Sequence, residues 1–148
     1  MEIQTKRLDL VPCTAENYSD FAAQYDMGPH INMHLAELED RPELLGWGVW
    51  MAVRRRDGKV IGDAGFKGMP DSAGVVEIGY GIAAEAQNQG FATEAVAGLI
   101  EWAFQTGRVE QVIAECANGN AASIKVLEKL GMHRTGADDE LVFWALKK

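Results

Sequence analysis

The feature that most constrains the fold is a change in the spacing of apolar residues near the middle of the chain. Between Gly48 and Ile82 apolar residues follow a period of two, and turn-forming residues at 56–59 and 70–74 divide the run. From Thr93 to Phe104 they recur every three or four positions, and Val109–Cys116 is again typical of a strand. Three antiparallel strands followed by a strand–helix–strand order require a crossover. The sequence therefore predicts at least one parallel pair in a mainly antiparallel sheet.

The remaining segments complete an α+β arrangement. The sequence predicts a strand at Leu8–Pro12, helices at Ala15–Tyr25, Ile31–Leu38 and Ala121–Leu130, and a last strand at Leu141–Leu146 with Met132–Thr135 as its candidate partner. This pattern indicates a mixed, mainly antiparallel sheet with helices on both faces, in one domain over residues 1–148. Gly79 and Gly81 lie inside the strand at 75–82, where glycine marks a bulge or a close backbone approach.

Composition disfavours several classes of protein. The chain has 148 residues, 47% of them hydrophobic, and no apolar run approaches the roughly 20 residues of a membrane-spanning helix. The first seven residues lack the apolar segment of a signal peptide, so we expect a soluble, cytoplasmic protein without a membrane partner. The net charge of −8 disfavours nucleic acid and favours a cationic partner such as an amine. Cys13 and Cys116 form no C-x-x-C pair, and we expect both to be buried structural residues.

One loop carries the clearest chemical signal. Gln87-Asn88-Gln89-Gly90-Phe91-Ala92-Thr93 lies between the strand that contains Gly79 and Gly81 and the long helix. Successive backbone N–H groups at the start of a helix form an anion site, and glycine at position 90 lets a phosphate approach the chain closely. The loop matches neither a Walker sequence nor G-x-G-x-x-G, so an ordinary strand-to-helix connection is the alternative.

A second polar segment opens the next helix. Asn118-Gly119-Asn120-Ala121-Ala122-Ser123 follows the strand at 109–116 and places amide and hydroxyl groups at a helix start. Capping of that helix by Asn120 and Ser123 explains these residue types without any ligand. The alternative is that the same groups face a ligand bound between the two strands.

Together these segments resemble the GNAT superfamily of acyl-CoA-dependent N-acyltransferases. The cofactor loop of that superfamily reads Q/R-x-x-G-x-G/A, which Gln87, Gly90 and Ala92 match. Other segments, in the right order over nearly the whole chain, are similar to the branch of ribosomal-protein N-terminal acetyltransferases: Thr5–Leu10, Glu77–Tyr80, Phe91–Ala95, Asn120–Ser123 and Glu128–Met132.

The resemblance implies a site for acetyl-CoA, as a co-substrate, in a V-shaped opening between a parallel pair of strands. Backbone groups near Ile82 and Ala83 would bind the pantetheine arm, and Asn120 would bind the cofactor from the other side of the V. The pyrophosphate would lie on the amides of Gln87, Asn88, Gln89, Gly90, Phe91, Ala92 and Thr93. Family members often carry Arg or Lys in this loop, whereas this chain has Gln-Asn-Gln, so the backbone amides must do most of the binding.

The resemblance also implies direct attack of an amine on the thioester, in a ternary complex and without a metal. A primary amine is mostly protonated at neutral pH, so a base or a water relay must remove a proton. Glu77 is the candidate base, with an outward-facing strand carboxylate as the alternative. A backbone N–H near Ile82 would stabilise the oxyanion. Ser123 is the candidate acid for the thiolate, because no tyrosine follows Tyr80 in the chain.

The sequence constrains the acceptor less than any other part of the predicted site. Trp47, Trp50 and Tyr80 are candidates for the wall of its pocket, although aromatic residues are more often core residues. His30 and His34 lack the accompanying residues of a metal site, so we expect them at the surface or at the pocket rim. The acceptor would be a protein N-terminus or a small amine. A non-catalytic acyl-CoA-binding module is the alternative function, and homodimers are common in the superfamily.

Overall fold

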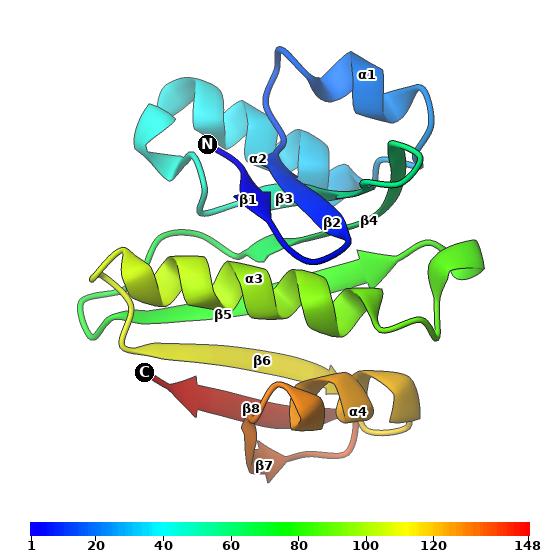
Figure 1. The fold of residues 1–148 in the computed structure, drawn as a ribbon. Coiled ribbons are helices and arrows are strands. Elements are labelled where there is room, and N and C mark those ends of the chain that lie inside the picture. The colour runs from blue at the N-terminus through cyan, green and yellow to red at the C-terminus, as the bar shows by residue number, and fades with distance from the viewer.

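The computed structural model describes residues 1–148, and one eight-stranded sheet runs through it in the order β1-β2-β3-β4-β5-β6-β8-β7 (Figure 1). All neighbouring strands are antiparallel except β5 and β6. The strands are β1 (Ile3–Gln4), β2 (Leu8–Pro12), β3 (Val49–Arg54), β4 (Lys59–Phe66), β5 (Val75–Ile82), β6 (Gln111–Ala117), β7 (His133–Ala137) and β8 (Leu141–Lys147). The predicted fold class is confirmed, including the pairing of the last strand with the segment that follows the last helix.

Helices cover both faces of the sheet. The helices are α1 (Tyr18–Ala22), α2 (Pro29–Asp40), α3 (Phe91–Gln105) and α4 (Ala121–Lys129), with short 3-10 turns at Pro42–Leu44 and Ala84–Ala86. Figure 1 shows α3 and α4 on the near face, while α1 and α2 lie over the N-terminal half of the sheet. None of the helices is both long enough and apolar enough to cross a lipid bilayer.

Two apolar clusters hold these layers together. The larger one joins α3 to the sheet, with Val96, Leu99 and Ala103 fully buried against residues such as Leu10 and Trp50. The smaller one lies under α1 and α2, where Cys13, Ile31, Val49, Met51 and Val60 pack together. Each buried side chain of this size contributes about 1.5–3 kcal/mol to folding. The N-terminal half of the sheet is therefore fixed from both faces.

The parallel pair is short, and its shortness opens the sheet. β5 and β6 pair only at Val75–Glu77 with Gln111–Ile113, although β5 continues to Ile82. The bulge predicted at Gly79 and Gly81 is absent, because β5 keeps a regular register with β4 through this segment. β5 therefore stays with β4 while its opposite edge leaves β6 beyond Glu77. The predicted splayed pair is present without the predicted bulge.

The first two helices differ in length from the prediction. α1 spans only Tyr18–Ala22 rather than 15–25. Its expected last turn is used in tertiary contacts: the Gln24 side chain accepts a hydrogen bond from the backbone of Val60, and the Tyr25 hydroxyl donates to Asp63. α2 is longer than the predicted 31–38, because Pro29 occupies its first turn and the helix continues to Asp40.

Candidate active site

The splayed edge of β5 offers free backbone groups. In the antiparallel ladder with β4, the Lys67 N–H donates to Glu77 and the Ala83 N–H donates to Ile61. Peptide groups on a strand alternate in direction, so those of Tyr80 and Ile82 point toward the opening beside β6. The Ile82 carbonyl accepts a hydrogen bond from the Gln87 side chain at 3.0 Å. Ala83 is already bonded, because its carbonyl also accepts from Ala86.

The loop that follows, residues 87–93, is rich in unpaired donors. None of the backbone N–H groups from Asn88 to Thr93 donates to a protein acceptor, and the first bond of α3 is that from the Glu94 N–H to the Gly90 carbonyl. Asn88 and Gly90 both have positive φ, at 61° and 81°, and left-handed residues in a turn are a feature of backbone sites that bind anions. The loop therefore has the geometry of an anion site at a helix N-terminus.

A cation that sequence reasoning did not assign lies beside this loop. Arg7 donates from Nε to Glu94 at 2.7 Å and from Nη1 to the Gln89 carbonyl at 3.0 Å. Its guanidinium stacks on the Phe91 ring, 4.1 Å from the centroid. Thr5 and the Arg7 backbone also donate to Glu94. Burial raises the pKa of Glu94, but these hydrogen bonds lower it by more. These contacts of Thr5 and Arg7 with Glu94 hold the N-terminal segment against the start of α3, and we call them the N-terminal clamp.

The N-terminus of α4 faces the opening from the other side. The Asn120 side chain accepts from the Ser123 N–H at 3.1 Å, so the predicted cap is present. Ser123 also lies beside the hydroxyl of Tyr80. Burial raises the pKa of that hydroxyl and the nearby Ser123 lowers it by less. The buried Tyr80 oxygen nevertheless makes no hydrogen bond of good geometry. The structure thus brings Tyr80, Ser123 and Asn120 together.

On the opposite face, a pocket lies between α2 and the strands β4 and β5; we call it the α2 pocket. Its lining consists of His30, Met33, His34, Glu37, Leu44, Trp47, Gly48, Val49, Asp63, Ala64, Gly65, Phe66, Lys67, Gly68, Gly79, Tyr80 and Gly81. The pocket includes the part of β5 that has left β6. A molecule bound in it can therefore reach the splayed edge of the sheet.

Charged groups in and beside the α2 pocket are mostly paired. Asp63 accepts from the Tyr25 hydroxyl at 2.7 Å and lies 2.9 Å from His30 Nε2. Lys67 donates to Glu77 at 2.6 Å. The predicted base, Glu77, therefore lies where β5 and β6 separate, and its carboxylate is held by Lys67.

The predicted aromatic residues are not equivalent. Trp47 lines the α2 pocket and packs against Phe66 and Trp102. Trp50 does not line it, because its ring lies in the core against Trp102 and its N–H donates to the Gly46 carbonyl at 2.8 Å. Strand alternation separates the two sides here: Trp50 faces α3, whereas its neighbours Val49 and Met51 face α2.

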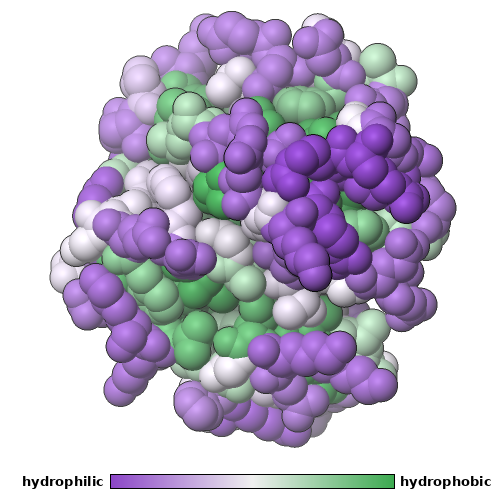
Figure 2. Space-filling view, in the orientation of Figure 1, coloured by the Kyte–Doolittle hydropathy of each residue, from purple (hydrophilic) through white to green (hydrophobic).

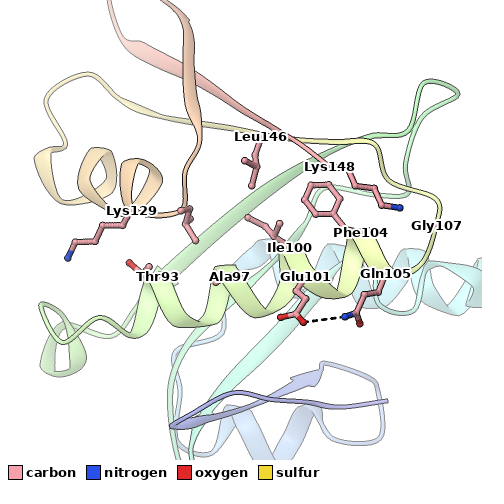
Figure 3. A pocket seen from close by; sticks show the side chains of 11 residues that line it. Thr93, Ala97, Ile100, Glu101, Phe104, Gln105, Gly107, Lys129, Leu146 and Lys148 are labelled. Carbon is pink, nitrogen blue, oxygen red and sulfur yellow. Dashed lines mark hydrogen bonds between the residues drawn. The ribbon is translucent and has the colours of Figure 1, made fainter.

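A second cavity lies on the face that carries α3 and α4 (Figure 3). Figure 2 shows apolar side chains exposed in this region between the two helices. Ile100, Phe104 and Leu146 form its apolar wall, and Lys129 and Lys148 lie at its edges. Of the predicted site residues only Thr93 lies here, at the end nearest the 87–93 loop.

Several site residues escaped the sequence analysis for identifiable reasons. Arg7 belongs to the Thr5–Leu10 segment that was recognised as a motif, yet its distance from residue 87 along the chain concealed its contact with the loop. Asp63 and Lys67 are ordinary polar residues of a strand by sequence alone. His34 was expected at the surface or at the pocket rim, and the structure places it among the residues that line the α2 pocket.

The fold and the splayed strand pair define a class of protein, the GNAT-type acyltransferase fold. Residues 7–133 match the Acetyltransferase (GNAT) domain family. The chain belongs to this family, and the resemblance to the GNAT superfamily found in the sequence is confirmed.

Individual relatives agree with this assignment. The chain is 33% identical over 99 residues to YjdG of Bacillus subtilis, an uncharacterized N-acetyltransferase, with 67% of this chain and 59% of that protein covered. It is 35% identical over 91 residues to the uncharacterized protein YkkB of the same organism, covering 60% and 53%. The matches thus span little more than half of the length of these curated relatives.

The fold is shared with solved structures at low sequence identity. The structure of ribosomal-protein-S5-alanine acetyltransferase from Vibrio fischeri superposes with a TM-score of 0.81 at 15% identity, covering 99% of this chain and 96% of that one. A GNAT-family acetyltransferase structure from Bordetella pertussis gives 0.78 at 21% identity, with 98% of each chain covered. At such identities the likeness establishes the fold alone.

Proposed function

We propose that the protein transfers the acetyl group of acetyl-CoA to a primary amine, by direct attack in a ternary complex. The observation that carries this proposal is the combination of the splayed β5 edge with the unpaired amides from Asn88 to Thr93. The two features adjoin along the chain. Together they offer hydrogen-bonding groups to an extended arm and positive dipole ends to a diphosphate.

The residues present fit the donor molecule. Acetyl-CoA supplies an activated acyl group as a thioester, and the chain supplies the groups that hold it. Ile82 would bond the arm, and the amides of the 87–93 loop would bond the pyrophosphate. Arg7 adds positive charge beside a loop that has none of its own. Asn120 retains a free side-chain NH2, because its cap bond uses only the oxygen.

The catalytic roles follow from the two sides of the opening. Glu77, or a water relay near it, would remove the proton of the amine on the α2 side. A backbone N–H near Ile82 would stabilise the oxyanion. Ser123 would donate a proton to the departing thiolate on the α4 side, and the adjacent Tyr80 hydroxyl supports a proton source there.

The acceptor would bind in the α2 pocket. The charged groups in and beside it are Glu37, Asp63 and Glu77 against Lys67, so the carboxylates outnumber the lysine when both histidines are neutral. A cationic amine is therefore favoured electrostatically. A protein N-terminus and a small amine both satisfy this condition. Several relatives of the fold carry ribosomal-protein acetyltransferase names, which supports testing N-terminal peptides.

Calorimetric titration with acetyl-CoA, repeated with CoA, is the first test. We expect saturable micromolar binding of acetyl-CoA, followed by CoA thiol release with a peptide that has a free N-terminal alanine or with 1,4-diaminobutane. Turnover that persists unchanged in both Glu77→Gln and Ser123→Ala would remove the assigned roles. Binding of acetyl-CoA without turnover of any amine would favour a non-catalytic acyl-CoA-binding module, and no binding at all would overturn the proposal.

A further inference from the structure

His34 occupies an unusual position in the α2 pocket. Its imidazole packs directly on the backbone of Gly48, the residue before β3, and a Cβ built on Gly48 would overlap the ring. A side chain at position 48 would occupy the space that the ring fills, so glycine at this position allows His34 to lie against the wall of the α2 pocket. A histidine that merely sits at the surface would not require this approach.

Most of the other titratable groups around His34 form hydrogen bonds or ion pairs with one another. Those that face the pocket are His30 and Glu37 from α2, Asp63 and Lys67 from β4, with Glu77 of β5 beside Lys67. His30 is bonded to Asp63, whose other oxygen holds Tyr25, and Lys67 is bonded to Glu77. β3 contributes no charged group to the lining. The imidazole of His34 has no such partner, so a ring nitrogen is free to accept a proton.

The surroundings also favour the neutral form of this ring. Burial lowers the pKa of His34, and the charge of Glu37 on the same helix raises it by less. A neutral imidazole can act as a base near neutral pH. The pocket that contains His34 also contains Gly79–Gly81, the part of β5 that has left β6.

We propose that His34 receives the proton of the acceptor amine, as the end of the relay on the α2 side; this role rests on the function proposed above. The amine nitrogen forms a bond to the acyl carbon, and the carbon–sulfur bond breaks with its electron pair on sulfur. The ammonium form of the amine loses two protons: one passes to the His34 imidazole and then to solvent before the attack, and the second leaves the nitrogen for solvent by the same route as the amide forms. The thiolate takes one proton from Ser123, which regains it from solvent, or directly from water. Glu77, held by Lys67, orients the water that lies between the amine nitrogen and the His34 imidazole.

The test is the pH profile of kcat/KM for His34→Gln, measured with whichever of the N-terminal alanine peptide and 1,4-diaminobutane the unchanged protein acetylates faster. We expect turnover to fall about 100-fold, within the range for loss of a general base, and the acidic limb of the profile to disappear. Acetyl-CoA affinity, measured by calorimetry, should not change. His133→Gln is the matched control, because His133 lies exposed on β7 and should leave the profile unchanged.

Two further measurements separate a catalytic from a structural role. Gly48→Ala keeps the histidine but displaces its ring, and it should reproduce the altered profile of His34→Gln. The C2 proton of His34 should titrate by NMR below the ordinary pKa of histidine in the unchanged protein. A normal acidic limb in His34→Gln, with turnover retained, overturns the role of His34 alone. Absence of turnover in the unchanged protein overturns both this role and the proposed function.

Discussion

The two sides of the splayed strand pair are built in different ways. On one side, the 87–93 loop and the start of α4 each present a short run of residues, consecutive in the sequence, that supplies backbone amides or capping groups. On the other, the α2 pocket is assembled from α2, β3, β4 and β5, whose residues lie far apart in the chain. The first side is defined by local backbone geometry and the second by packing. Different substitutions should therefore damage each side.

The largest effect should come from a substitution of Gly65, a residue of β4 that lines the α2 pocket. A Cβ on Gly65 would overlap the backbone carbonyl of Gly48, which cannot move without disturbing the β3–β4 ladder. We expect Gly65→Ala to lower the free energy of unfolding by about 3 kcal/mol, as overpacking does. Urea unfolding measures this change. Gly79, its partner across β4 and β5, is the control, since a Cβ there meets only the end of Lys67 at 3.8 Å.

A smaller effect should follow from loss of the N-terminal clamp, the contacts of Thr5 and Arg7 with Glu94. Glu94→Gln removes the charge that Thr5 and Arg7 bond, and we expect a loss of about 2 kcal/mol, typical of hydrogen bonds to a charged group. Because the folded-state pKa of Glu94 is lowered, its contribution is present at neutral pH and is lost as the pH falls through that lowered value. The variant should lack this part of the acid dependence.

Unfolding at pH 7 and at successively lower pH checks this prediction. Glu101→Gln is the matched control on the same helix, because Glu101 is exposed and bonds only the Gln105 side chain. Equal pH dependence in the unchanged protein and in Glu94→Gln would contradict the role of the clamp.

Backbone strain in the loop should cost less again. Gly90 has φ of 81°, and a Cβ there would lie 3.4 Å from Arg7, so Gly90→Ala introduces strain without a serious overlap. We expect a loss of about 1 kcal/mol together with weaker binding of acetyl-CoA. Gly107→Ala has a similar φ of 75° and nothing nearby, so it should lose similar stability and keep its affinity. Equal affinities in the two variants would contradict a contribution of the backbone conformation at Gly90 to binding of the donor.

The smallest effect is expected for the charge of Asp57, which lies on neither side of the splayed strand pair. Asp57 lies in the exposed β3–β4 turn, where its hydrogen bond with Arg54 lowers the pKa of Asp57 to about 2. Its contribution is present above the ordinary pKa of aspartate and disappears as the pH falls toward 2. Asp57→Asn should leave stability at pH 7 unchanged within error, because exposed ion pairs contribute little. Urea unfolding at pH 7 measures the difference.

Local sequence predicted the side made of consecutive residues well. The cap formed by Asn120 and the strand–helix–strand crossover both follow from neighbours in the chain. Prediction was less accurate where tertiary contacts compete with local preference. α1 ends early because Gln24 and Tyr25 bond β4, and Gly79 and Gly81 lie in a regular ladder rather than a bulge.

The sequence by itself determined the order of elements, the mixed sheet and the loop of free amides, because these depend on periodicity and turn chemistry over short distances. Only the tertiary structure decided which side chains share the α2 pocket. Strand alternation sends Trp50 into the core, and the approach of α2 to β3 and β4 places His34 on Gly48 and His30 beside Asp63. Such pairs depend on how layers pack, and residues 14 to 33 positions apart carry no local signal of their contact.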